Sequence, residues 1–218
     1  MRKLVNKYYF SVEGQTEKWY LERLQDLINS CDNAKTNVKF DCDVQKKPIK
    51  KAKSLVIKDK TEIWHLFDYE SNEESHIKRF QDTLDALHSV PKKLHKQIIY
   101  KPGYSNFTFE LWMILHKSNC KRMFSHREQY LDVINKVYHE KFNSLNSYKD
   151  KNNFYKCLEK INLQDVKDAT ARALEIMETN KTNGYKIQNF KGFSYYQENP
   201  SLTIHEIIGK ILTDCGLM

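Results

Sequence analysis

Five acidic residues stand where carboxylates can act on a phosphate group. Glu13 and Glu17 follow the first apolar run of the chain, Asp68 and Glu70 follow a later one, and Glu110 lies inside an apolar stretch. Carboxylate oxygens are the ligands that hard divalent cations such as Mg²⁺ prefer. The set therefore has the composition of a one- or two-metal phosphoryl-transfer site, where the metal polarises a phosphate oxygen and activates water.

Glu13 and Glu17 flank a predicted strand-to-helix turn. The run 8–12 reads as a strand, Gly14 allows the chain to turn without an obstructing side chain, and a helical pattern follows. Glu17 suits the positive end of that helix, so it is either a helix-start residue or a functional acid. In open α/β sheets, ligands bind at the carboxyl ends of the strands, which is where these acids are expected.

Glu110 is the only acid in the run 107–116, which is apolar on nearly every side. The pattern predicts a helix over this run, with Ser105 and Asn106 before it as caps. A carboxylate in such a segment is costly to bury unless it is protonated, paired or bound to a cation. Glu110 is therefore less easily explained as a purely structural residue than the other four.

The remaining periodicity predicts strands that alternate with helices. Helical spacing occurs over 17–30, 45–60 and 75–88, and strand patterns occur over 38–44, 63–67 and 97–100, the last closed by Pro102-Gly103. The order β-α-β-α-β-α-β implies parallel pairing with right-handed crossovers. The predicted fold class is α/β, a mostly parallel sheet flanked by helices.

The second half of the chain is predicted to be mostly helical, with a last helix over 202–212. We expect an α/β core over 1–120 and a helical C-terminal part over 121–218 that packs on the core. Between its helices, 182–199 mixes lysines, glycines and aromatic residues. Such a segment is either a loop on which bases stack or, as we favour, a loop packed on the domain.

Composition favours one sizeable core and anionic partners. The 218 residues are 40% hydrophobic, with a formal net charge of +8 and a pI near 9.1. A basic surface attracts polyanions such as nucleic acid, although a lysine-rich solubility surface is the alternative. The same alternatives apply to the lysines of 45–60, a solvated helix face or a phosphate-contacting patch.

The absence of a signal-peptide pattern and of a bilayer-length apolar run predicts a cytoplasmic protein with no membrane partner. Five dispersed cysteines without a Cys-x-x-Cys pair predict reduced thiols and no structural zinc site.

Three motifs together resemble the RloB/AbiLii family. They are Glu13-Gly14-x-Thr16-Glu17-x-x-Tyr20, Phe67-Asp68-x-Glu70, and Ser105-Asn106-x-x-Phe109-Glu110-Leu111-Trp112-x-x-Leu115-His116. The similarity continues through Tyr148-Lys149 with Asn152, Ala169 and Ala173, and Asn199-Pro200-Ser201 with Thr203 and His205. Members of the family carry a Toprim domain and occur in bacterial restriction and abortive-infection loci.

The resemblance implies a role for each acid. Glu13 corresponds to the Toprim glutamate, a metal ligand and general acid or base, and Asp68 with Glu70 corresponds to the metal-binding acid pair. Glu17 matches a second glutamate of related nucleases, and Glu110 is the candidate for a further downstream acid. Glu13 and Asp68 are thus the expected catalytic residues. This chain departs from the family pattern at Glu70, where aspartate is usual, and at Phe107, where proline is common.

The resemblance also implies a Mg²⁺- or Mn²⁺-dependent nuclease in antiphage defence by abortive infection. Its substrate would be DNA or tRNA, and a partner ATPase of the AAA or ABC type would regulate it. One alternative is a non-catalytic module that binds nucleic acid or the ATPase. Another is a different phosphoryl-transfer enzyme, such as a small primase-like polymerase.

Overall fold

A computed structural model describes residues 3–218. In chain order the elements are β1 (Val5–Val12), α1 (Gln15–Asn29), β2 (Asn37–Val44), α2 (Pro48–Ser54), β3 (Thr61–Asp68), α3 (Glu74–Leu94), β4 (Ile98–Asn106), α4 (Glu110–Leu115), η1 (Arg127–Gln129), α5 (Tyr130–Tyr138), α6 (Leu145–Tyr148), α7 (Lys151–Glu159), α8 (Leu163–Thr182), β5 (Gln188–Phe190), β6 (Phe193–Tyr195), β7 (Ser201–Leu202) and α9 (Ile204–Asp214). The predicted alternation of strands and helices up to β4 is confirmed.

The main sheet has five strands in the order β2-β1-β3-β4-β7. The first four strands are parallel, and β7 pairs antiparallel with the end of β4. The chain leaves β1 through α1 toward one edge and continues from β3 toward the other, so the strand order reverses between β1 and β3. The α/β class with a mostly parallel sheet is confirmed.

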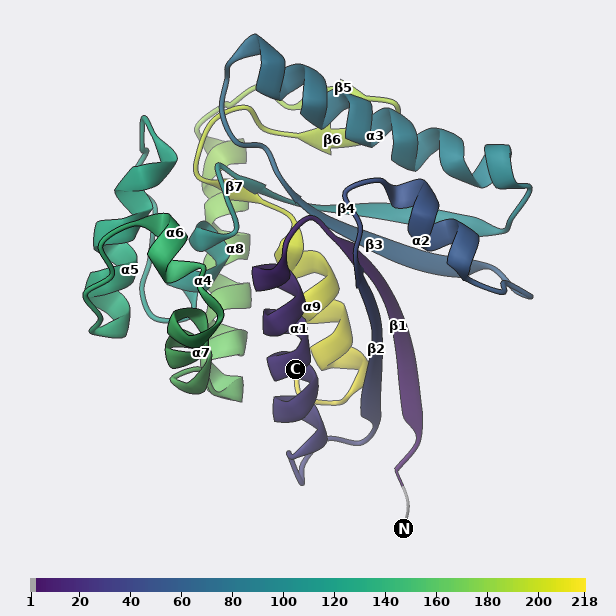
Figure 1. The fold of residues 1–218 in the computed structure, drawn as a ribbon, viewed down its shortest axis with the longest axis horizontal. Coiled ribbons are helices and arrows are strands. Elements are labelled where there is room, and N and C mark those ends of the chain that lie inside the picture. Colours follow the sequence, from purple (N-terminus) through teal and green to yellow (C-terminus); the bar gives the residue numbers. More distant parts are fainter. Residues whose placement is uncertain (1–2) are drawn as a thin grey trace.

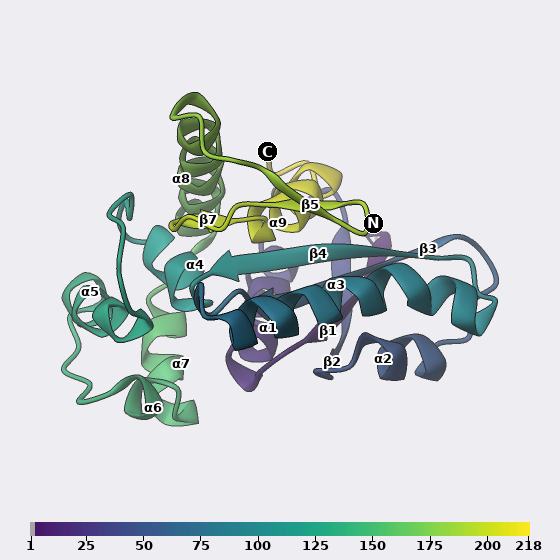
Figure 2. The ribbon, with the colours of Figure 1, turned by 90° about the horizontal axis from the view of Figure 1, so that it is seen from above.

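Helices cover both faces of this sheet (Figure 1). Helices α1 and α9 supply apolar side chains to the larger core on one face, which α4, α5, α7 and α8 extend. Helices α2 and α3 enclose a smaller core on the other face. Helices α4 to α7 gather beyond the end of the sheet toward which β4 points (Figure 2). Helices α4, α5, α7 and α8 therefore share one hydrophobic core with α1 and α9.

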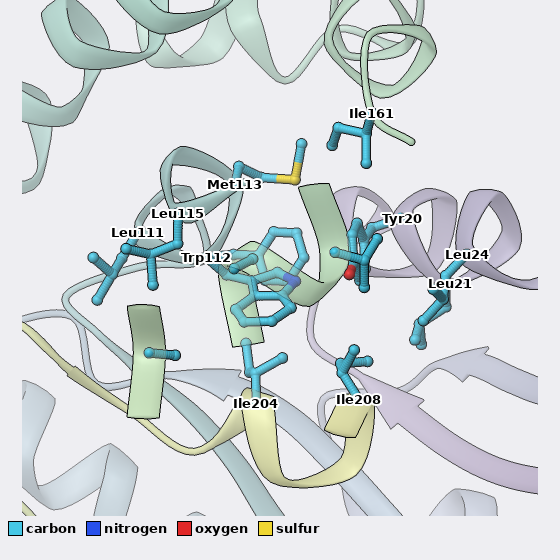
Figure 3. Close-up of a cluster of buried hydrophobic side chains, with 14 of the residues drawn as sticks. Tyr20, Leu21, Leu24, Leu111, Trp112, Met113, Leu115, Ile161, Ile204 and Ile208 are labelled. Atoms are coloured by element: carbon cyan, nitrogen blue, oxygen red, sulfur yellow. The ribbon is translucent and has the colours of Figure 1, made fainter. Parts of the chain in front are cut away.

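Trp112 of α4 lies at the centre of the larger core (Figure 3). Its ring is fully buried and meets the Tyr20 ring of α1 edge-on, with the centroids 6.1 Å apart. Ile204 and Ile208 of α9 point toward it from the sheet side (Figure 3). One aromatic side chain thus packs the first helix, the last helix and the segment that carries Glu110 together.

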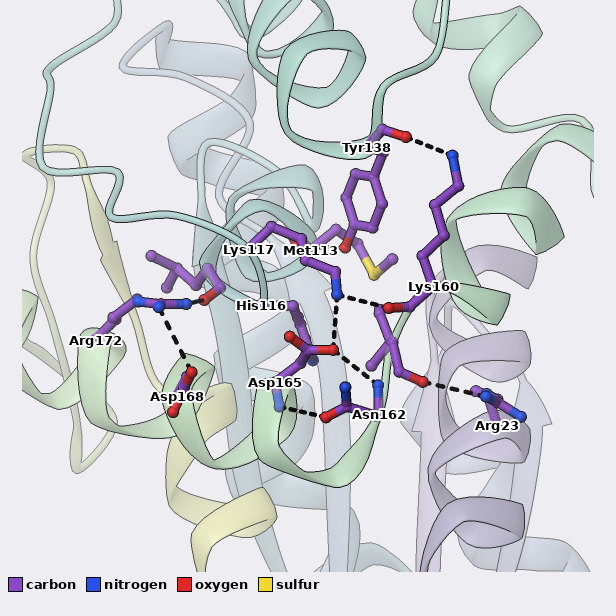
Figure 4. Close-up of polar contacts among 12 residues, drawn as sticks. Arg23, Met113, His116, Lys117, Tyr138, Lys160, Asn162, Asp165, Asp168 and Arg172 are labelled. Carbon is purple, nitrogen blue, oxygen red and sulfur yellow. Dashed lines mark hydrogen bonds and ion pairs between the residues drawn. The ribbon is translucent and has the colours of Figure 1, made fainter.

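Polar contacts hold α4 and its neighbours in place (Figure 4). Lys117, just after α4, donates to the Lys160 carbonyl at 2.6 Å and to Asp165 at 2.7 Å. Arg172 of α8 donates to the Leu115 carbonyl at 2.6 Å, and Arg23 of α1 donates to a carbonyl before α8 at 3.1 Å. Because these donors saturate backbone carbonyls at helix ends, they fix how the helices meet.

The expected end of the fourth strand is wrong, because β4 continues through Pro102-Gly103 to Asn106. A proline is tolerated there because β7 pairs with β4 only at Ser105 and Asn106, so no ladder partner needs the missing N–H. Gly103 allows Leu66 to pack closely, since a Cβ would lie 2.4 Å from the present position of Leu66 Cδ2. A helix in the run 107–116 is confirmed, but its expected start and its Ser105-Asn106 cap are wrong, because α4 begins only at Glu110 and both residues belong to the strand.

The aromatic segment before β7 packs on the domain, as favoured from the sequence. Its strands β5 and β6 form an antiparallel hairpin, and Tyr195 lies buried against Phe80 of α3, with the ring centroids 4.9 Å apart.

The lysine-rich helix predicted over 45–60 is shorter in the structure, where it is α2. Its Lys51 is buried between Asp41 and Asp43 of β2, at 2.5 and 2.7 Å. Lys51 therefore has a structural role as the partner of two aspartates, and the question of phosphate contact concerns only the exposed lysines around it.

The five cysteines form no disulfide. Burial raises the pKa values of Cys42 and Cys157 to about 12, which keeps both thiols protonated and unreactive.

Within residues 3–218, no helix has the length and apolar character needed to cross a bilayer.

Truncation of Trp112 tests the central packing. Trp112→Ala should lower the free energy of unfolding by about 3–5 kcal/mol, because the change removes a fully buried aromatic group and leaves a cavity. Urea denaturation of the variant measures this loss. Leu174→Ala on the exposed side of α8 is the control and should change stability by less than about 0.5 kcal/mol. Equal losses in the two variants would contradict the central role of Trp112.

Candidate active site

The register of the central strands brings two of the predicted acids together. Val12 of β1 pairs with Leu66 of β3, so Glu13 emerges beside the last residues of β3. The Glu13 amide donates to the Leu66 carbonyl at 3.0 Å, and the Asp68 amide donates to Glu13 Oε2 at 3.3 Å. This point is the reversal in strand order, the usual place of a ligand-binding crevice in an open parallel sheet.

Glu17 is buried in the first turn of α1, with 5% of its surface exposed. Its carboxylate accepts a hydrogen bond from the Thr16 hydroxyl at 2.9 Å. A Cβ at Gly14 would lie 2.9 Å from the same oxygen, so the glycine provides the room in which Glu17 folds back. Gly14 is therefore needed for close approach and not for an unusual backbone angle, because its φ is −132°.

Glu110 begins α4 and is 1% exposed. Its Oε1 forms an ion pair with Lys149 Nζ at 3.1 Å, and Lys149 follows directly after α6. Among the residues that the structure describes, this ion pair is the one polar contact of the Glu110 carboxylate, and the buried Tyr148 hydroxyl has no hydrogen-bond partner. A buried carboxylate with a single cationic neighbour is under-satisfied by ordinary standards.

The electrostatics show that these acids share one environment. Burial raises the pKa of Asp68 well above its usual range, and the charges of Glu17, Glu13 and Glu110 add to the effect while Lys149 opposes it. Burial also raises the pKa of Glu17, with a further contribution from Glu110. Burial lowers the pKa of Lys149, but the surrounding carboxylates outweigh it and leave that pKa raised. Lys149 is thus a firmly charged counter-ion to a crowded acidic group.

Glu70 has different partners. It adopts a left-handed backbone conformation, with φ of 63°, just after β3. Its Oε2 accepts from Arg79 Nη1 at 2.8 Å and lies 3.1 Å from His76 Nε2, both on α3. Of the five predicted acids, the structure therefore links four through one electrostatic environment and engages Glu70 with α3.

An open cleft of about 260 Å³ lies over the acids. Its lining residues are Glu13, Gly14, Gln15, Thr16, Glu17, Lys46, Asp68, Glu70, Arg127 and Lys149. Three of these are cations that we did not predict as site residues. Lys149 belongs to a motif of the family resemblance and Lys46 begins a lysine-rich run, but Arg127 gave no signal in the sequence.

A divalent cation fits this cleft by the chemistry of its donors. Glu13, Glu17 and Asp68 line the cleft and offer the oxygen ligands that Mg²⁺ and Mn²⁺ prefer. Glu110 does not line the cleft, but its charge acts on both Glu17 and Asp68. Across residues 3–218, no three His, Cys, Asp or Glu side chains already stand together as a metal-binding group. The donor types therefore suit a cation, whereas the side-chain positions are not those of a preformed coordination shell.

The family model of RloB-like proteins matches residues 8–211, which is nearly the whole chain. The chain belongs to the RloB-like family. The resemblance found in the motifs is thereby confirmed for the family. No curated protein and no solved structure matches the chain. The roles of the individual acids in this RloB-like protein accordingly depend on the geometry described above.

The raised pKa of Asp68 predicts how stability changes with pH. A carboxyl with a higher pKa in the folded than in the unfolded protein holds its proton longer in the folded state. The free energy of unfolding therefore falls as the pH rises above the unfolded value of about 4. We expect Asp68→Asn to remove part of this fall, so that the metal-free variant melts higher than wild type near neutral pH but not near pH 4.

Thermal unfolding in EDTA across this pH range measures the difference. Asp82→Asn, an exposed position within α3, is the matched control and should follow the wild-type curve. If Asp68→Asn showed the same pH dependence as wild type, Asp68 would not be held in a repulsive environment.

Proposed function

We propose that this RloB-like protein is a Mg²⁺- or Mn²⁺-dependent nuclease that cleaves phosphodiester bonds in the cleft at the ends of β1 and β3. The observation that carries the proposal is the gathering of four carboxylates, of which Glu17 and Glu110 are buried and Glu13 and Asp68 are partly buried, with raised pKa values at Asp68 and Glu17. Such an arrangement is destabilising on its own, and clusters of this kind are typical of functional sites. A bound divalent cation would relieve it.

In this proposal Glu13, Glu17, Asp68 and Glu110 hold the ion, and Glu70 does not, because Arg79 and His76 already engage its carboxylate. When bound, the ion supplies Lewis-acid polarisation of a phosphate oxygen and lowers the pKa of a bound water.

The chain's own groups complete the reaction. Glu13 is only partly buried and receives one hydrogen bond, from the Asp68 amide, so its carboxylate is placed to take a proton from the attacking water. Lys149 is cationic and lies at the wall of the cleft, where it offsets negative charge on the phosphate.

A polyanionic substrate suits the rim of the cleft. Lys46, Arg127 and Lys149 line it together with the acids, and the chain carries a formal net charge of +8. Basic groups around an acidic centre would bind the phosphate backbone while the ion acts at one phosphodiester bond. Both DNA and tRNA offer this backbone, and the proposal covers both.

Family membership supports a wider setting for the proposed nuclease. We propose that it acts in the cytoplasm in antiphage defence by abortive infection, and that a partner ATPase of the AAA or ABC type restrains or triggers it.

A second function is a module that binds nucleic acid or the ATPase without cutting. The ion pair between Lys149 and Glu110 favours it, because a lysine can neutralise such a cluster permanently in place of a metal. In that case Lys149 is a structural counter-ion, and the acids bind no divalent cation.

Cleavage by a Glu13 variant tests the catalytic proposal. Glu13→Gln should fold normally and lose cleavage by at least about 100-fold, since it removes the proposed base and an ion ligand. The purified protein is incubated with Mn²⁺ and plasmid, single-stranded DNA or total tRNA, and the fragments are separated on gels. Glu22→Gln, an exposed residue of the same helix α1 as Glu17, should cut at the parental rate. Parental cleavage by Glu13→Gln would remove Glu13 from the mechanism.

Metal uptake separates the enzyme from the binding module. Wild type should take up Mn²⁺ in titration calorimetry, and Asp68→Asn should abolish or strongly weaken that uptake, because Asp68 lies at the centre of the acidic group. A wild-type protein that takes up no Mn²⁺ would leave the nuclease without its mechanism and would support the binding module.

A further inference from the structure

A second cavity of about 330 Å³ adjoins the acidic cleft. Its lining residues are Glu70, Ser71, Glu73, His76, Arg79, Phe107, Ser125, His126 and Arg127. Two residues, Glu70 and Arg127, line both this cavity and the acidic cleft. A ligand that occupied the cavity would therefore lie next to the proposed reaction centre.

The cavity presents hydrogen-bond donors from two separate parts of the chain. Arg79 and His76 come from the first turns of α3, whereas His126 caps the start of η1 and Arg127 is its first residue. His126 Nδ1 accepts from a backbone amide at 3.3 Å, which leaves its Nε2 as the N–H donor when the ring is neutral. The positive end of the 21-residue helix α3 lies at the same edge. These groups suit an anion.

The two arginines are not equivalent. Arg79 is paired with Glu70 at 2.8 Å, and the other cavity acid, Glu73, stands just before α3. Arg127 has one charged neighbour among the described residues, Glu128, at 4.0 Å, and its side chain is 49% exposed. Arg127 is therefore the less engaged cation, and it stands where the cavity meets the cleft.

Glu70 holds the side chains of α3 that line the cavity. Its Oε2 contacts both Arg79 and His76, and the other ring nitrogen of His76 is 2.7 Å from the Ser71 hydroxyl. The chain Arg79–Glu70–His76–Ser71 therefore orients one side of the cavity. Glu70 pairs with Arg79, whereas Arg127 has only the more distant ion pair with Glu128, so Arg127 is the cation more available to a ligand.

We propose that this second cavity binds a phosphodiester of the nucleic-acid strand next to the one that is cleaved. Arg127 contacts the phosphate, and Glu70 is a positioning residue for Arg79 and His76. The proposal rests on the proposed function, since it assigns the path of the substrate through the same site. Guanidinium groups suit it, because their planar N–H pairs match phosphate oxygens.

Binding without cleavage tests the assignment. Fluorescence anisotropy with a labelled 20-nucleotide single-stranded DNA, and separately with labelled tRNA, is measured in EDTA over a series of salt concentrations. Arg127→Ala should weaken binding about 3- to 10-fold and lower the slope of log K against log salt by about 0.7 to 1, as expected for one lost phosphate contact. Arg122→Ala is the matched control, because Arg122 is exposed on the same connecting segment and lines neither cavity.

Equal affinity and equal salt slope in wild type and Arg127→Ala would overturn the proposal. So would a loss in Arg122→Ala as large as that in Arg127→Ala, since it would show only a general effect of charge. The failure of the proposed function has a different signature, namely no Mn²⁺-dependent cleavage by wild type while the Arg127 effect on binding persists.

Glu70→Gln provides the second arm. If Glu70 positions Arg79 and His76 for the phosphate, the variant should bind the labelled DNA more weakly, because a neutral amide holds the two side chains less firmly, and it should keep the wild-type Mn²⁺ affinity. Mn²⁺ affinity reduced as far as in Asp68→Asn would assign Glu70 to the ion and overturn its role here.

Discussion

Like-charge repulsion in a buried place is the constraint around which this protein is arranged. The pairing of β1 with β3 brings Glu13 to Asp68, and the start of α1 adds Glu17. Burial is the largest cause of the raised pKa of Asp68, and the neighbouring carboxylates raise that pKa further, because each makes it harder for the next to ionise. The favourable free energy that holds them there must come from elsewhere, chiefly from apolar burial around α1, α4 and α9.

The C-terminal helices supply both that packing and the countercharge. Helix α4 carries Glu110 into the site, and the turn after α6 carries Lys149 to it. Tyr138 of α5 donates to the Met113 carbonyl of α4 at 2.7 Å, and α8 contacts both α4 and α9. A site that begins at the strand ends is thus completed by helices more than forty residues later in the chain. Their positions decide how closely Lys149 approaches the acids.

The sequence allowed the fold class and the convergence of the strand-end acids to be predicted, because periodicity and chain order are local signals. The alternation of strands and helices placed Glu13 and Asp68 at one edge, and the apolar surroundings of Glu110 marked it as unusual. The end of β4 was missed because Pro102-Gly103 signals a turn locally. In the folded protein Gly103 instead lets Leu66 pack closely and Pro102 needs no ladder partner. The spacing of residues in the sequence does not show such contacts between β4 and its neighbours in the fold.

The contacts of side chains with distant partners were beyond such reasoning. Nothing in Asp68-x-Glu70 shows that Arg79 and His76 engage the second acid, because that contact depends on the left-handed conformation at Glu70 and on the start of α3. Both acids line the acidic cleft, but Glu70 also lines the neighbouring cavity, where its carboxylate contacts Arg79 and His76. Two acids that stand one residue apart in a motif therefore have different electrostatic environments, and the difference arises from contacts that the motif does not contain.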